Sequence, residues 1–215
     1  MSSDVATQAE PALRADALRN RRRILEAAAE AFSEGGLDVG VAEIARRAGV
    51  GAGTLFRRFP TKEDLIFAII EERSGELVEA GREALEEPDP ALALRRFMFA
   101  GVEKHVRDQG FFDAVVSRVN KEERLREHRD QIVDIAGQLL RRAQDAGAAR
   151  DDIAPEDLPL LMCATASAIS PLHGAMPDLW RRYAGLVLDG LKPEGASPLE
   201  HVAPTLADFD AAMSG

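Results

Sequence analysis

The chain has 215 residues and a formal net charge of −10 at pH 7, so it is long enough for one large helical domain or two smaller ones. Tyr and Trp occur once each, while Ala, Leu, Arg and Glu are frequent, and this composition favours an all-α fold. No run approaches the roughly 20 uninterrupted apolar residues of a membrane span, and residues 1–12 do not resemble a signal sequence. We therefore expect a cytoplasmic protein with no membrane partner.

The first predicted helix follows an arm. Residues 1–18 have no apolar period and are expected to be flexible. A helix over 20–34 is predicted next, because apolar residues recur there at helical spacing, and Gly35 with Gly36 ends it. Arg22 is placed for an ion pair with Glu26 one turn later.

Two short helices are predicted over 41–48 and 52–59. They meet at Gly49, a residue type that accepts a left-handed helix cap at no steric cost. Pro60 closes the second helix, because proline disfavours helical geometry in the residue before it. The pattern indicates two short helices joined by a tight turn.

A fourth helix is predicted from Thr61, where Asp64 forms a pattern close to a capping box. Its apolar residues cover more than one face, which indicates a connecting helix. Asp89 and Pro90 mark a boundary and the start of the next helix. Further helices are expected over 90–108, 111–119, 122–146, 155–170 and 177–191, followed by a weakly structured tail.

Basic charge gathers near the N-terminus. Residues 1–60 contain nine Arg and eight Asp or Glu, a net charge of +1, which leaves −11 on residues 61–215. A DNA phosphate backbone responds to such local patches and not to the total charge. In the segment 52–59, Thr54, Arg57 and Arg58 are expected to face outward, as in the second helix of a helix-turn-helix. From these residues alone, a small bundle with solvated arginines remains an alternative.

Residues 22–70 resemble the N-terminal domain of the TetR (TetR/AcrR-like) family of transcriptional regulators. The resemblance rests on Ile24-Leu25-Glu26-Ala27-Ala28, Phe32, Gly36-Leu37, Ile44-Ala45, Ala48-Gly49-Val50, Gly53-Thr54-Leu55-Phe56, Phe59-Pro60 and Lys62-Glu63-Asp64-Leu65. It implies four parts: an arm (1–18), a helix-turn-helix DNA-binding domain (19–64), a helical ligand-binding and dimerisation domain (65–191) and a tail (192–215).

The resemblance also implies site residues. Thr54 stands at a base-contacting position, and Arg58 and Lys62 stand at phosphate-contacting positions. Three positions depart from the family pattern: Phe56 replaces the usual Tyr that reaches a phosphate, Gly40 replaces a capping Thr, and Ala52 replaces a longer polar residue. We expect the extra charge of Arg57, Arg58 and the cluster Arg19 to Arg23 to compensate. The complete set expected at the DNA is Arg22, Gly40, Arg47, Gly51, Ala52, Gly53, Thr54, Phe56, Arg57, Arg58 and Lys62.

In the second half of the chain, residues 180–191 look like the last helix of one TetR subgroup. The resemblance implies that this helix and the helix over 155–170 correspond to the helices that form the dimer interface in the family. From the residues alone, core helices are an equal alternative. The residues expected at the dimer interface are Leu161, Thr165, Ala168, Tyr183 and Val187. The residues expected at the ligand are Phe97, Gly101, His105, Phe112, Val116, Met162, Ile169 and Met176, although each also fits a plain core position. The single cysteine, Cys163, lies in an apolar run and is expected to be buried.

The predicted function is a ligand-responsive repressor that binds an inverted-repeat operator as a homodimer and is released by a small effector. The alternative is a ligand-binding helical module with weakened or lost operator binding. The four His residues have no metal-ligand spacing, and no phosphate loop or nucleophile motif is present in the sequence. We therefore expect no enzyme activity, catalytic residue, metal or cofactor.

Overall fold

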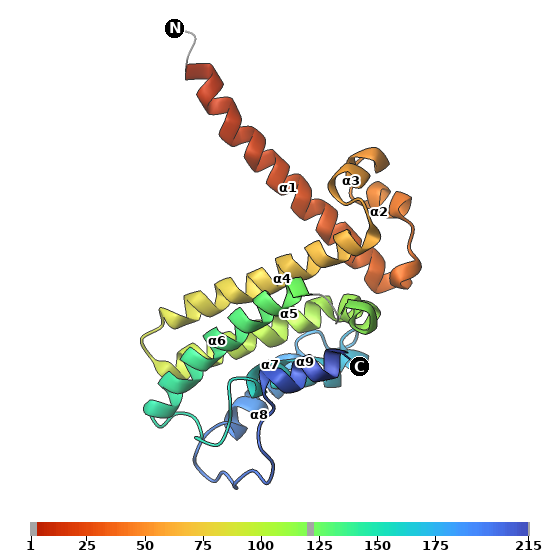
Figure 1. Ribbon diagram of the computed structural model, residues 1–215. Helices are drawn as coiled ribbons and strands as arrows, with labels where there is room; N and C mark the ends of the chain where they lie inside the picture. The colour runs from red at the N-terminus through yellow and green to blue at the C-terminus, as the bar shows by residue number, and fades with distance from the viewer. Residues whose placement is uncertain (1–3, 120–122, 215) are drawn as a thin grey trace. The chain divides into compact units, whose positions relative to one another are not determined.

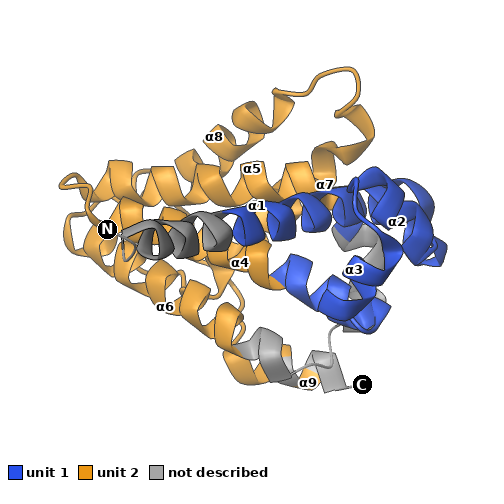
Figure 2. Cartoon of the chain, turned by 90° about the horizontal axis from the view of Figure 1, so that it is seen from above, with its two compact units in different colours: residues 1–70, 110–115 blue, residues 71–109, 116–215 orange. Residues whose placement is uncertain are grey.

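The computed structural model describes residues 4–119 and 123–214, with side chains described for residues 16–111, 127–209 and 211. Over these residues the chain folds into helices and connecting turns without a strand, which confirms the all-α prediction (Figure 1). The chain forms two compact units, coloured in Figure 2: unit 1 is Met1–Ile70 with Gly110–Val115, and unit 2 is Glu71–Gln109 with Val116–Gly215. Within the described part, no helix is both long and apolar enough to cross a membrane.

Unit 1 contains the predicted pair of short helices. Its elements are α1 (Asp4–Gly35), the 3₁₀ helix η1 (Gly36–Asp38), α2 (Val41–Arg47), α3 (Ala52–Arg58) and the start of α4 (Lys62–Leu85). The turn between α2 and α3 passes through Gly49, whose φ of 63° lies in the left-handed region. Apolar side chains of all four α-helices are buried, among them Ile24, Phe32, Ile44, Leu55 and Leu65.

Helix α1 begins at Asp4 and not near Asn20 as expected, so the predicted flexible arm is helical from Asp4 onward. The prediction relied on an apolar period, which this stretch lacks. The stretch is rich in alanine, which has the highest helix propensity of all residues and needs no apolar face to favour a helix.

Unit 2 is a bundle of longer helices. Its elements are the later turns of α4, most of α5 (Pro90–Val119), α6 (Glu123–Asp145), α7 (Asp157–Ile169), the 3₁₀ helix η2 (Ser170–Leu172), α8 (Leu179–Gly190) and α9 (Leu206–Ser214). Asp89 caps α5 as predicted, because its Oδ1 accepts hydrogen bonds from the backbone N–H groups of Ala91 (2.9 Å) and Leu92 (3.2 Å). Helices α5 and α8 meet where the rings of Phe99 and Trp180 pack edge to face, 5.7 Å apart.

Helix α5 is one continuous helix where two were expected. Gly110 lies inside it, because a glycine in a helix costs only about 1 kcal/mol and does not necessarily end the helix. In unit 1, Gly110 lies so close to α1 that an added Cβ would clash with the hydroxyl of Ser33. The next residue, Phe111, packs on Phe32 with ring centroids 6.3 Å apart. The glycine is therefore a packing position of α5 against α1.

The tail is more structured than expected, because it contains α9. Thr205 and Asp208 cap this helix: the Thr205 N–H donates to the Asp208 carboxylate (2.8 Å), and the Asp208 N–H donates to the Thr205 hydroxyl (3.3 Å). Before α9, the N–H of Leu199 donates to the Asp152 carboxylate (3.2 Å), which ties the tail to unit 2.

The compact units divide α4 after Ile70, whereas the sequence prediction placed the domain boundary after Asp64. Leu65, Ile66 and Ile69, in the first turns of α4, are all buried and belong to unit 1. The start of α4 is capped as predicted, since Thr61 and Asp64 exchange hydrogen bonds. Helix α4 therefore contributes residues to both units.

Candidate nucleic-acid interface

The outward face of α3 carries the residues predicted to contact DNA. Leu55 and Phe59 are buried and fix the inward face of the helix. Thr54, Phe56 and Arg57 therefore face away from the core, and Phe56 is 52% exposed. A helix presented in this way after a tight turn has the geometry of a recognition helix that enters the major groove.

The first residues of α3 have very small side chains or none. Gly51 is the N-cap and makes no side-chain capping hydrogen bond, and Ala52 and Gly53 are exposed. Gly40, the N-cap of α2, also provides no side-chain cap. The first amides of α3 can therefore approach a phosphate or base edge closely. The polar side chains that the family pattern has at positions 40, 52 and 56 are absent.

Two of the predicted arginines have carboxylate partners. Arg22 pairs with Glu26 (Nε to Oε1, 3.9 Å). Arg47 pairs with Glu34 of α1 (2.7 Å) and with Glu43 of α2 (2.8 Å). Hydrogen bonds from Arg46 and Arg47 lower the pKa of Glu43 to about 2. These pairs neutralise the arginines, and the pair with Glu34 ties α2 to α1.

The other predicted cations have neutral partners. Arg57 donates to the hydroxyl of Thr54 (3.4 Å), Arg58 donates to the carbonyl of Ala17 (3.2 Å), and Lys62 donates to the carbonyl of Leu37 (2.6 Å). Among the residues that the structure describes, none of the three has an ion pair. Each keeps its full positive charge, which is what a phosphate contact requires.

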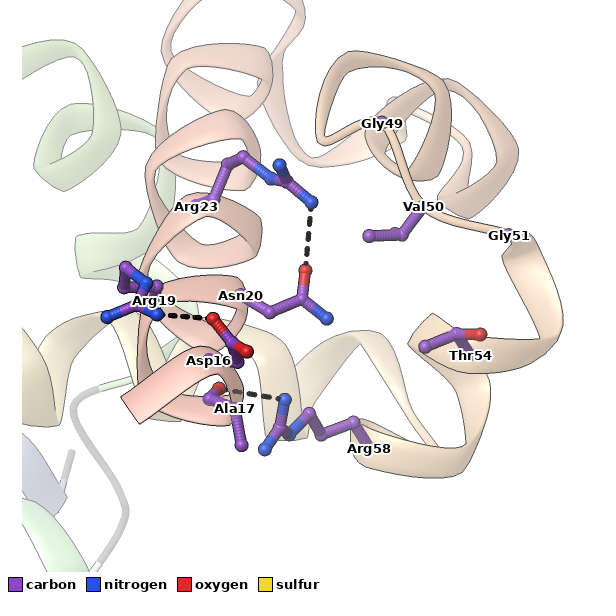
Figure 3. A pocket seen from close by; sticks show the side chains of 10 residues that line it. All are labelled: Asp16, Ala17, Arg19, Asn20, Arg23, Gly49, Val50, Gly51, Thr54 and Arg58. Carbon is purple, nitrogen blue, oxygen red and sulfur yellow. Dashed lines mark hydrogen bonds and ion pairs between the residues drawn. The ribbon is translucent and has the colours of Figure 1, made fainter. Parts of the chain in front are cut away.

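A cleft between α1 and the helix-turn-helix brings together residues from separate parts of unit 1. It has a volume of about 850 Å³, and it is lined by Asp16, Ala17, Arg19, Asn20, Arg23, Gly49, Val50, Gly51, Thr54 and Arg58 (Figure 3). Asn20 was not predicted at the site, and Arg23 was predicted only as a member of the cluster Arg19 to Arg23, because α1 was predicted from its apolar face. The spacing of Asp16, Asn20 and Arg23, one helical turn apart, was the available signal.

The residues predicted at the ligand lie mostly in the core of unit 2. Phe97, Met162 and Ile169 are buried, and a Cβ added to Gly101 would clash with the sulfur of Met162. His105 is hydrogen-bonded to the Gly101 carbonyl (3.0 Å), and its burial lowers its pKa, so the neutral ring is favoured. Met176 is exposed, and the side chains of Phe112 and Val116 lie outside those described.

The residues predicted at the dimer interface divide into two groups. Tyr183 and Ala168 are exposed, and Leu161 and Val187 line an apolar groove of about 400 Å³ on α7 and α8. Thr165 points inward: it is buried, and its hydroxyl donates to the Leu161 carbonyl (2.6 Å). Exposed apolar residues on these helices that the prediction did not include are Leu160 and Leu186.

Cys163 is exposed, which corrects the prediction that it is buried. It follows Met162, which is fully buried. Adjacent positions on a helix point about 100° apart, so the side of α7 that buries Met162 turns Cys163 outward.

Within unit 2, a cluster of charged residues joins α4 to α5 that the sequence prediction also missed. Arg73 pairs with the buried Asp108 (3.1 Å), and Glu76 pairs with Lys104 (3.0 Å) and Arg107 (2.8 Å). Burial would raise the pKa of Glu76, but hydrogen bonds from Arg107 and Lys104 outweigh it and lower this pKa to about 2. The carboxylate of Glu76 is therefore strongly stabilised in its ionised form.

A helix-turn-helix with cations on its outward face, followed by a helical unit, defines a DNA-binding transcriptional regulator. The family model described as bacterial regulatory proteins, tetR family, matches residues 24–69. A second, described as transcriptional regulator SbtR-like, C-terminal domain, matches residues 89–193.

Solved structures agree with these matches. The TetR transcriptional regulator SCO0520 from Streptomyces coelicolor is 36% identical with a TM-score of 0.64, and the match covers 81% of this chain and 99% of that one. A TetR transcription regulatory protein from Mycobacterium vanbaalenii is 37% identical with a TM-score of 0.60, over 84% and 99% of the two chains. The chain belongs to the TetR family of transcriptional regulators. Its family and fold are those of regulators and not of enzymes.

A curated relative matches part of the chain. The HTH-type transcriptional regulator SAB2452 of Staphylococcus aureus (strain bovine RF122 / ET3-1) is 43% identical over 60 residues, which is 27% of this chain and 32% of that protein. The match thus spans about a third of the relative's length.

Proposed function

We propose that this chain is a homodimeric repressor that binds an inverted-repeat operator and is released by a small effector. The observation that carries the proposal is the outward face of α3. There Thr54 lies beside Arg57, and both Arg57 and Arg58 have neutral partners. Thr54 would contact bases in the major groove, while Arg57, Arg58 and Lys62 would contact phosphates. Such a protein would act in the cytoplasm, where the DNA is.

An exposed apolar surface supports the dimer. Leu160, Tyr183 and Leu186 are between 42% and 54% exposed on α7 and α8, and large exposed apolar side chains in one region are typical of protein interfaces. We propose that Leu161, Ala168 and Val187 take part in this interface. A two-fold dimer presents two recognition helices to two half-sites, which accounts for an inverted repeat.

The effector would bind in unit 2, among the side chains of α5 and α7. The packing of Gly101 against Met162 fills the place expected for a ligand, so an effector would have to move the Met162 side chain. A ligand can release DNA only to the extent that it binds better to the DNA-incompetent conformation. Helix α4 contributes to both units, and we propose that it carries this coupling.

We also propose a role for each part of the chain. We assign DNA binding to residues 19–64, ligand binding and dimerisation to 65–191, and accessory roles to the arm (1–18) and the tail (192–215).

The alternative function, a ligand-binding module with weakened operator binding, is favoured by one observation. Phe56 is half exposed on α3 and has no polar atom in its side chain to donate to a phosphate.

The test is binding of the purified protein to labelled DNA from the region upstream of its own gene, at two salt concentrations. We expect saturable binding that weakens with salt and with Arg58→Ala. Arg82→Ala is the matched control, because Arg82 is an exposed arginine of unit 2 that pairs with Glu79. Absent or purely non-specific binding would contradict the repressor and favour the ligand-binding module.

A further inference from the structure

We propose that α1 forms a second wall of the DNA-binding surface, and that Arg23, supported by Asn20, binds an operator phosphate there. The inference rests on the proposed function and adds residues to its site. Its basis is the cleft between α1 and the turn that precedes α3, all of which lies within unit 1.

The cleft places α1 beside the start of the recognition helix. One side is formed by Asn20 and Arg23 of α1, and the other by Val50, Gly51 and Thr54 (Figure 3). In Figure 3, the side chains of Asn20 and Arg23 extend from α1 on the side of the turn, whereas that of Arg19 extends to the opposite side. A DNA strand contacted by Thr54 would therefore pass next to Arg23.

The charge of the cleft suits a phosphate. Its lining contains three arginines and one carboxylate, a net charge of +2. The carboxylate, Asp16, is neutralised by its ion pair with Arg19. The other two arginines have only neutral partners among the described residues: Arg23 donates to Asn20 Oδ1 (3.0 Å) and Arg58 donates to the Ala17 carbonyl (3.2 Å).

The Asn20 contact orients the Arg23 guanidinium without neutralising it. An arginine offers five N–H donors in a planar fork, so one hydrogen bond to Asn20 leaves others for a phosphate. Such a contact would offset the phosphate hydrogen bond that Phe56, lacking a hydroxyl, cannot make. Arg23 thus provides affinity that α3 alone lacks.

The experiment compares Arg23→Ala with Arg82→Ala in binding to the upstream DNA, measured by fluorescence anisotropy between about 50 and 200 mM salt. Arg82 is the matched control, because it is an exposed arginine paired with a carboxylate, Glu79, and lies outside the cleft. Arg23→Ala should weaken binding by about tenfold. It should also reduce the slope of log K against log salt by about 2 in a dimer, at about 0.9 for each lost phosphate contact.

A second variant separates charge from geometry. Arg23→Lys keeps the positive charge but loses the planar fork, so it should retain most of the wild-type salt slope while binding more weakly than wild type. Circular dichroism should give unchanged helix content for all three variants, since both arginines are exposed.

Two outcomes overturn the inference, and they are distinguishable. If wild type binds saturably and Arg23→Ala matches Arg82→Ala in affinity and slope, the α1 contact is wrong while the proposed function stands. If wild type itself shows no saturable binding, the proposed function fails and the inference fails with it.

Discussion

The charged cluster between α4 and α5 allows a prediction with a magnitude. Replacing Glu76 with Gln keeps the shape of the side chain but removes the carboxylate that accepts hydrogen bonds from Lys104 (3.0 Å) and Arg107 (2.8 Å). Arg107 retains a bond to Asp108 (2.9 Å), whereas Lys104 has no other carboxylate partner among the described residues. The substitution therefore leaves a partly buried ammonium group uncompensated.

The pKa shift of Glu76 determines how large a loss of stability we expect. It falls from the ordinary value of 4.5 to about 2, and a tenfold change in proton affinity corresponds to about 1.4 kcal/mol. The full difference would be on the order of 3 kcal/mol, and screening by solvent at a partly exposed group reduces it to about 1 to 2 kcal/mol. Because the pKa is lower in the folded chain, this stabilisation is complete above about pH 5 and is lost as the pH falls towards 2.

The measurement is urea unfolding followed by circular dichroism, at one protein concentration and at about pH 7 and about pH 3. Glu76→Gln should lower the free energy of unfolding by about 1 to 2 kcal/mol at the higher pH and by clearly less at the lower pH. Glu79→Gln on the same helix is the control, because the Glu79–Arg82 pair is exposed and should be worth less than about 0.5 kcal/mol. Equal losses for the two variants, or no pH dependence, would refute the reasoning.

Three further predictions test other parts of the structure. Phe56→Tyr adds a hydroxyl on the exposed face of α3 and should tighten operator binding about fivefold in the anisotropy assay; unchanged affinity would count against a phosphate near this position. Gly101→Ala forces a Cβ against Met162 and should destabilise the fold by about 1 to 3 kcal/mol in urea, whereas Gly75→Ala, with no atom within 4 Å of its new Cβ, should stabilise it slightly. Cys163 should react slowly with a thiol reagent at high protein concentration and faster on dilution, because a dimer would cover it; concentration-independent reactivity would place α7 outside the interface.

Local signals made the turn between α2 and α3 and two helix caps predictable. The turn at Gly49 and the caps at Thr61 and Asp89 depend on residues within four positions of each other, and each formed as predicted. The spacing of apolar residues identified the inward face of α3, and with it the outward position of Thr54. Such features follow from backbone geometry and need no knowledge of distant contacts.

The partners of charged groups were not predictable, because they depend on tertiary packing. Arg47 pairs with Glu34, 13 positions away, and Arg58 bonds to Ala17, 41 positions away. Helical spacing alone cannot give these contacts. For the same reason, the apolar run of α7 did not indicate which side would be covered, so the exposure of Cys163 was missed.

The partners of the arginines, local or distant in sequence, bear on which arginines we expect to contribute to DNA binding. An arginine held by a carboxylate brings no net charge to the surface, because it must break that pair before it binds a phosphate. We therefore expect Arg22 and Arg47 to contribute weakly, and Arg23 and Arg58, which are held by an amide and a carbonyl oxygen, to contribute strongly.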